Sequence, residues 1–157
     1  MSALATTRAA LFALLAGVPG IGQVHDRERY GRDEAKFRQL YVARVNGADQ
    51  LRGWWFRRSA TSEVTLGVGR RMEVHTWQLR GYMALADDAG SELVFDELIE
   101  ALRDAVRTTA DAGGVPWEPA PFDSPTDGLQ VVQIGPVIFC SVLCHSALLE
   151  LKTWNYL

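Results

Sequence analysis

Two cysteines and a histidine lie close together in the segment FCSVLCHSALLELKTW, where Cys140, Cys144 and His145 could serve as a nucleophile with its base or as metal ligands. The segment has the composition of a β-strand. Four strand residues advance about 13 Å, too far for Cys140 and Cys144 to form a disulfide or bind one zinc ion. Adjacent strand residues face opposite sides, so Cys144 and His145 cannot pair catalytically. We therefore expect two reduced thiols, which favours a cytoplasmic origin.

The other two histidines, His25 and His75, lie in separate segments without a metal-binding spacing such as H-E-x-x-H. We expect no metal and no cofactor. The glycines of GVPGIG and GVGRR lack the strand, helix and lysine context of a phosphate-binding loop. His75 could still face Cys144 across a sheet. The sequence therefore favours a protein that is not an enzyme, with a small-molecule-binding α/β module or a minor enzyme using His75 and Cys144 as the alternative.

The strongest secondary-structure signal is a helix predicted within residues 86–114, ending at Gly113 and Gly114. Ser91 or Asp88 can cap its start. Its charged residues are spaced for weak ion pairs and are typical of a solvated face, where nothing desolvates the carboxylates. The residues predicted to be buried recur at helical spacing: Phe95, Leu98, Ile99, Leu102 and Val106.

The segment 1–17 combines Arg8 with an apolar run, as a secretory signal does. No clear cleavage site follows, and an amphipathic first helix that ends at Gly17 is the simpler interpretation. Its predicted apolar stripe consists of Leu4, Leu11, Phe12 and Leu15. No other apolar run is long and charge-free enough to span a bilayer, so we expect no membrane association.

The segment 51–85 is predicted to form an extended β-hairpin, after a charged connection at 26–37, a strand at 38–45 and a turn at 46–50. In its second arm the apolar residues change from even to odd positions, with Met72 before the change and Trp77 after it, so the apolar side chains move from one face of the strand to the other. A β-bulge would produce this switch, and so would cover from another subunit over the outer half of the strand. The second explanation is favoured.

The whole chain, residues 1–157, is predicted to form one domain, because 157 residues with 48% hydrophobic content fit a single globular core. The element order of helix, strands, helix and strands predicts an α/β (α+β) fold. We expect a mixed, mostly antiparallel β-sheet flanked by two main helices, with an extended hairpin. The net charge of −3 argues against general attraction to nucleic acid or anionic membranes.

Tryptophan and arginine, which commonly anchor protein interfaces, are concentrated on the hairpin and in the proline-rich loop after the long helix. The hairpin arginines predict a positive strip that suits an acidic protein or passing DNA, although a merely solvated hairpin is the alternative. Trp55 points away from its neighbours and needs cover from a second subunit or a helix. The interface candidates are Trp54, Trp55, Phe56, Arg57, Arg58, Arg70, Arg71, Trp77, Trp117 and Phe122.

The phrases HTWQLRGYMALAD and CHSALLELKT, with the size and element order of the chain, resemble the tail terminator, or tail completion (head-tail joining), proteins of long-tailed bacteriophages and related gene transfer particles. The resemblance extends from Val24 onward and includes no catalytic motif. It implies a mixed sheet flanked by two helices and a hexameric ring at the head-proximal end of the tail tube. It also implies that the hairpin 54–82 contributes to subunit or tube contacts and that the loop 111–128 reaches a neighbour or the neck.

Such a ring would be assembled in the bacterial host cytoplasm and reside in the virion tail. Its partners would be further copies of itself, the tail tube protein and a neck or head-completion protein. DNA would pass through the lumen without sequence-specific binding. The tryptophan-rich GWWF and the long proline loop have no match in the family pattern, which leaves open which neck or tail component this is.

Overall fold

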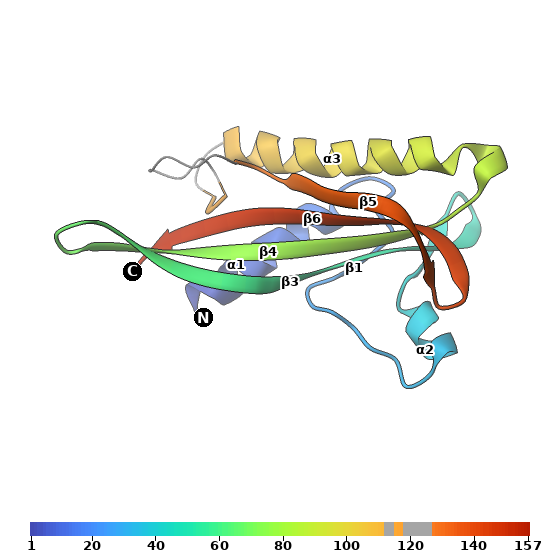
Figure 1. The fold of residues 1–157 in the computed structure, drawn as a ribbon, viewed down its shortest axis with the longest axis horizontal. Helices are drawn as coiled ribbons and strands as arrows, with labels where there is room; N and C mark the ends of the chain where they lie inside the picture. The colour runs from blue at the N-terminus through green and yellow to red at the C-terminus, as the bar shows by residue number, and fades with distance from the viewer. Residues whose placement is uncertain (112–114, 118–126) are drawn as a thin grey trace.

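A computed structural model describes residues 1–111, 115–117 and 127–157 (Figure 1). Its strands form one sheet in the order β1-β3-β4-β6-β5, to which β2 adds by pairing with β3. Of the described strand pairings only β1 with β3 is parallel. The elements are α1 (Ala3–Ala16), β1 (Gln23–His25), α2 (Glu34–Gln39), β2 (Val42–Val45), β3 (Ala48–Gly67), β4 (Arg70–Ala84), the 3-10 turn η1 (Asp87–Ala89), α3 (Ser91–Asp111), β5 (Gln130–Phe139) and β6 (Val142–Tyr156).

This architecture confirms the predicted fold class: a mixed, mostly antiparallel sheet with two main helices and an extended hairpin, β3–β4. The hairpin turns at Val68 and Gly69, where Gly69 adopts a positive φ of 75° that favours glycine. The turn between β2 and β3 uses Asn46 and Gly47, both at positive φ, as expected for a two-residue hairpin.

The main core lies between one face of the sheet and the two long helices; we call this side the helix face. Five predicted α3 residues are buried there, which confirms that prediction, whereas Gly113 and Gly114 lie outside the described residues. The predicted apolar stripe of α1 is confirmed for Leu11 and Leu15, which are buried. It is wrong for Phe12, whose side chain is 39% exposed. Leu11 and Leu15 stand one turn apart and face the sheet, and Phe12 is rotated away from that line.

A second, smaller core covers the opposite face of the sheet and was not predicted. Its buried residues are Tyr41, Leu51, Trp55, Phe139 and Cys144. The rings of Tyr82 and Phe139 stack with centroids 4.1 Å apart, and the Tyr41 ring meets Phe139 edge-on at 5.0 Å. Residues 37–41 thereby pack against the β5–β6 turn, far away in the sequence.

The segment predicted as a charged connection contains α2, so that prediction and the predicted strand at 38–45 need correction. The side chain of Asp33 caps the start of α2 by accepting a hydrogen bond from the Lys36 amide at 2.9 Å. The helix runs to Gln39, and β2 starts only at Val42. The Arg38 guanidinium donates to the carbonyl oxygen of Cys140. The segment is therefore held by its own chain.

The parity switch in β4 does not come from a bulge in that strand, because β4 pairs with β6 in unbroken register. A bulge does occur at Ser59 in β3, opposite the step from Trp77 to Thr76. Trp77 faces the helices, whereas Met72 lies on the opposite face and is fully buried. Since the single chain already covers Met72, the favoured explanation, cover by another subunit, is wrong for this residue.

Candidate interaction surface

Half of the ten predicted interface residues lie in the interior of the folded chain. They are at most 5% exposed: Trp54, Trp55, Phe56, Trp77 and Trp117. The interface prediction is wrong for these five, because the main core encloses four of them and the second core encloses Trp55. Trp55 thus finds its cover within the chain, where the Arg57 guanidinium also lies 5.5 Å from its ring centroid. Phe122 lies outside the described residues.

The four hairpin arginines are all exposed, but they do not form one strip. Arg58 is directly opposite Trp77 and so lies on the helix face, with Arg71 on the same parity of β4. Arg57 and Arg70 lie on the opposite face. Alternation along each strand separates Arg57 from Arg58 and Arg70 from Arg71. The sequence could not show that Arg58 shares its face with Arg71, because the bulge at Ser59 shifts the alignment of the two strands.

Two of these arginines are engaged within the chain. Arg57 forms an ion pair with Glu28 at 3.0 Å, and the Arg70 guanidinium lies 5.4 Å from the Tyr156 ring centroid. The guanidinium groups of Arg58 and Arg71 have no ion-pair partner among the described residues. Arg58 and Arg71 are therefore the pair available to a neighbouring molecule.

Residues 57–73 form a projecting piece of the hairpin, which we call the outer arm. Figure 1 shows it extending beyond both helices at one end of the molecule. Strands β1 and β2 pair with β3 only between Ala48 and Trp55. From Phe56 to Gly67, the side of β3 away from β4 has no strand partner among the described residues. This leaves an open sheet edge on an arm that adds little to the core.

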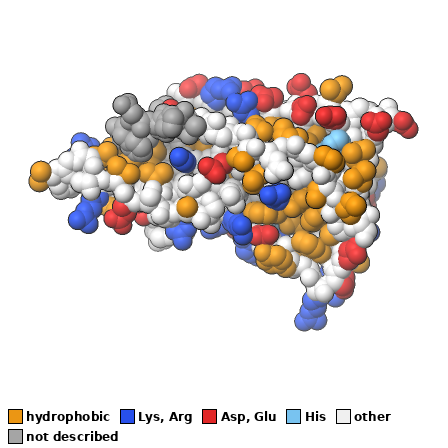
Figure 2. All heavy atoms as spheres, viewed as in Figure 1, with side chains coloured by type: hydrophobic (Ala, Val, Ile, Leu, Met, Phe, Trp, Pro, Cys, Tyr) orange, Lys and Arg blue, Asp and Glu red, His pale blue; other side chains and the backbone are white. Residues whose placement is uncertain are grey.

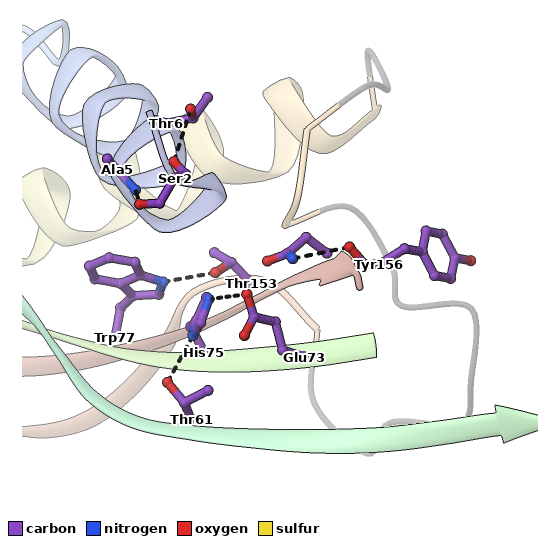
Figure 3. A network of polar contacts seen from close by, with 10 residues as sticks. Ser2, Ala5, Thr6, Thr61, Glu73, His75, Trp77, Thr153 and Tyr156 are labelled. Carbon is purple, nitrogen blue, oxygen red and sulfur yellow. Dashed lines mark hydrogen bonds and ion pairs between the residues drawn. The ribbon is translucent and has the colours of Figure 1, made fainter. Parts of the chain in front are cut away.

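Polar contacts at the base of the outer arm tie its strands together (Figure 3). The His75 side chain is 1% exposed; its Nδ1 lies 2.8 Å from Thr61 Oγ1 and its Nε2 lies 3.3 Å from Glu73 Oε1. Between β4 and β6, Trp77 Nε1 donates a hydrogen bond to Thr153 Oγ1 at 2.8 Å. These contacts link β3, β4 and β6 at the point where the arm leaves the core.

His75 and Cys144 are not brought together. Cys144 is paired with Ala84 of β4, and His75 lies nine positions further along that strand, about 30 Å away. The register therefore offers no shared site for these two side chains. Cys140 and Cys144 are both free thiols. They do not share one strand as predicted, because Cys140 lies in the turn between β5 and β6 at a positive φ of 50°.

A serine and a histidine that the sequence did not single out as a pair are in contact. Ser91 Oγ lies 2.7 Å from His145 Nε2, and it accepts a hydrogen bond from the Ala86 amide at 2.8 Å. The His145 ring stacks on Phe95. A hydroxyl beside an imidazole is half of a nucleophile and base arrangement, but Ser91 is only 7% exposed. The contact fastens the start of α3 to β6, and the only sequence signal for it was Ser91 as a helix cap.

The Cys144 thiol is expected to be unreactive in the folded protein. Its side chain is completely buried, and burial raises its pKa to about 11. At pH 8 we expect it to react with Ellman's reagent only after unfolding, on the timescale of global opening. Rapid stoichiometric labelling of Cys144 in the native protein, located by mass spectrometry, would contradict this assignment.

The same raised pKa predicts alkaline destabilisation. An acid whose pKa is higher in the folded than in the unfolded state stabilises the fold below its unfolded value and loses that contribution as pH rises above about 9. For Cys144 the expected loss by pH 10 is about 1 kcal/mol. Burial also raises the pKa of Tyr41 and Tyr82, which act in the same direction. Urea unfolding at pH 7.5 and pH 10 should show a smaller pH effect in Cys144→Ala than in the parent.

Besides the outer arm, the strand β5 is exposed, because it is the edge strand next to β6. It carries no charged residue, and five of its apolar side chains are between 36% and 74% exposed: Val131, Val132, Ile134, Val137 and Ile138. Figure 2 shows apolar side chains gathered over this part of the surface. An uncharged, apolar edge strand is a ready site for pairing with another strand.

Within the described ranges, no group of three or more His, Cys, Asp or Glu side chains is arranged to hold a metal ion, and none of the described helices is long and apolar enough to cross a membrane. No known family model and no curated protein matches the chain. The candidate interaction surface consists of the outer arm at one end of the sheet and the open edge of β5.

Proposed function

We propose that the protein is a structural assembly protein of a phage-like tail. In this proposal it forms a homo-oligomeric ring, a hexamer, that terminates the tail tube and joins it to the head connector. The observation that carries the proposal is the outer arm, a two-stranded projection with an open edge and exposed arginines. Such an arm contributes little to its own core and is well placed to contact a neighbour.

The assignment to a tail rests on the resemblance to tail terminator proteins. The two phrases that carry it form the neighbouring strands β4 and β6 at the centre of the sheet, with Trp77 opposite Leu151. The mixed sheet with two flanking helices agrees with the architecture that the resemblance implies. The proposed partners are further copies of the chain, the tail tube protein and a neck or head-completion protein, with DNA crossing the lumen.

The alternative, a small-molecule-binding module or minor enzyme using His75 and Cys144, has weaker support. These side chains are separated by about 30 Å along the sheet, so one ligand cannot contact both. No described contact joins them to a common group.

Native mass measured over a dilution series tests the proposal. A closed ring predicts one discrete multiple of 17.4 kDa, sixfold for a hexamer, that persists over a broad range of concentration. Incubation with purified tail tubes should then place the protein at one tube end in electron micrographs. A monomer at every concentration, together with bare tube ends, would contradict the proposed function.

A further inference from the structure

The open edge of β5 presents a defined set of backbone groups. Pro136 has no amide hydrogen, so in a paired edge strand it is accommodated where that amide would point away from β6. The two-residue turn at Cys140 and Ser141 leads to the same assignment. The pair that closes such a turn, Phe139 with Val142, is hydrogen-bonded, and hydrogen-bonded pairs alternate with non-hydrogen-bonded ones, so Pro136 falls on a non-hydrogen-bonded pair. The amides and carbonyls of Ile134 and Ile138 therefore point outward.

This edge is limited as well as open. The bulge at Val132 and the missing amide of Pro136 interrupt the ladder, and both are devices that restrict pairing at edges. Between Ile134 and Ile138 a stretch of about five residues is left, in which the amides of Ile134 and Ile138 can donate outward and Pro136 between them offers only its carbonyl oxygen. The exposed side chains of this stretch are apolar, so its partner needs no compensating charge directly on the strand.

We propose that β5 is the receiving strand of the ring contact and that the open β3 edge of the outer arm of a second copy adds to it, head to tail. This inference rests on the proposed self-assembly and specifies its interface. The open stretch of β3, from Phe56 to Gly67, is long enough to cover this five-residue part of β5. The outer arm and the β5–β6 turn lie at opposite ends of the molecule, as a head-to-tail contact requires (Figure 1).

Charge complementarity favours a second copy as the occupant. The outer arm carries four arginines and two glutamates, whereas α3 carries six carboxylates and two arginines. Arg103 Nε donates to the Leu129 carbonyl oxygen at 3.2 Å, which brings one flank of α3 beside the start of β5. Asp96 and Glu100 occupy the preceding turns on that flank; Glu100 forms an ion pair with Arg103 at 2.9 Å, whereas Asp96 has no ion-pair partner among the described residues. Arg58, on the helix face of an incoming arm, would meet this acidic flank.

An alternative contact, β5 with β5 of a second copy, would join two molecules about a two-fold axis and leave the outer arm unused. The two arrangements respond differently to mutations in β5 and in the outer arm. A head-to-tail contact needs one β5 and one arm, whereas the two-fold contact needs two intact β5 strands and no arm.

Two variants separate these cases: Ile134→Lys with Ile138→Lys in β5, and Arg58→Glu with Arg71→Glu in the arm. All four positions are exposed, so each variant should retain the parent's circular dichroism spectrum and melting cooperativity. Each alone should lose the ring, with a rise of about a hundredfold in the dissociation constant of the contact. Phe12→Lys and Arg44→Glu, exposed positions on α1 and β2, are matched controls that should keep the ring.

Mixing the two defective variants gives the decisive result. Each retains one intact half of the contact, so the mixture should form a 1:1 complex of twice 17.4 kDa and grow no further. A ring that persists in either variant, or a mixture that stays monomeric, overturns this interface while leaving the ring itself intact as a proposal. An arm variant that still dimerises through β5 identifies the two-fold contact instead. A parent protein that stays monomeric and also leaves tube ends bare contradicts the proposed function.

Discussion

Trp77→Ala is expected to lower the free energy of unfolding by about 4 kcal/mol. Trp77 is fully buried at the centre of the sheet, between the Phe56 ring at 5.9 Å and the Arg8 guanidinium at 5.1 Å. Its removal leaves a cavity in the main core and deprives Thr153 Oγ1 of its donor. Urea-induced unfolding followed by far-UV circular dichroism would measure the loss.

The packing and hydrogen-bond contributions of Trp77 can be separated. Trp77→Phe keeps an aromatic ring but removes the indole donor, and Thr153→Val removes the acceptor. In a double-mutant cycle these two changes should be less than additive, since both break the same hydrogen bond. A loss below about 1 kcal/mol for Trp77→Ala would mean that the site collapses freely and is not a central packing position.

Gly81→Ala should destabilise the protein by about 2 to 3 kcal/mol, although alanine is better suited to a strand than glycine. A Cβ atom at Gly81 would lie 2.5 Å from three ring atoms of Trp54, far inside contact distance. Trp54 cannot move away easily, because its ring is buried and stacked on Phe95 with centroids 6.0 Å apart.

A matched glycine in the same sheet provides the control for this change. A Cβ at Gly135 of β5 meets no described atom within 4 Å, so Gly135→Ala should be neutral or slightly stabilising. Equal melting temperatures for Gly81→Ala and Gly135→Ala would show that the close approach of Gly81 to Trp54 does not constrain the sheet. Both variants can be compared by differential scanning calorimetry.

The elements that the sequence predicted well have a single buried face with one period. The helix α3 is such a case, because Phe95, Ile99 and Val106 repeat at helical spacing and all face the sheet. The sheet was harder to predict, since it is covered on both faces along part of its length. At GWWF, alternation correctly sends Trp54 and Phe56 to one side, but it cannot show that the chain folds a second core over Trp55.

The candidate site could be predicted only in part, for a related reason. The four exposed hairpin arginines were predicted from composition, but which of them share a face depends on how β3 is aligned with β4, and the bulge at Ser59 shifts that alignment. The open edge of β5 depends on strand order, which local patterns do not encode. The Ser91 and His145 contact joins residues 54 positions apart, beyond any spacing rule.

The central position of β4, between β3 and β6, also has a consequence for biosynthesis. The ribosome completes the β3–β4 hairpin before it begins β6, and the residues between Ala84 and Val142 take a few seconds to translate at about 5 to 20 residues per second. During that interval the nascent hairpin has an unpaired side along β4 and an aromatic face that still lacks α3. Until β6 emerges, that unpaired side is open to pairing with another strand.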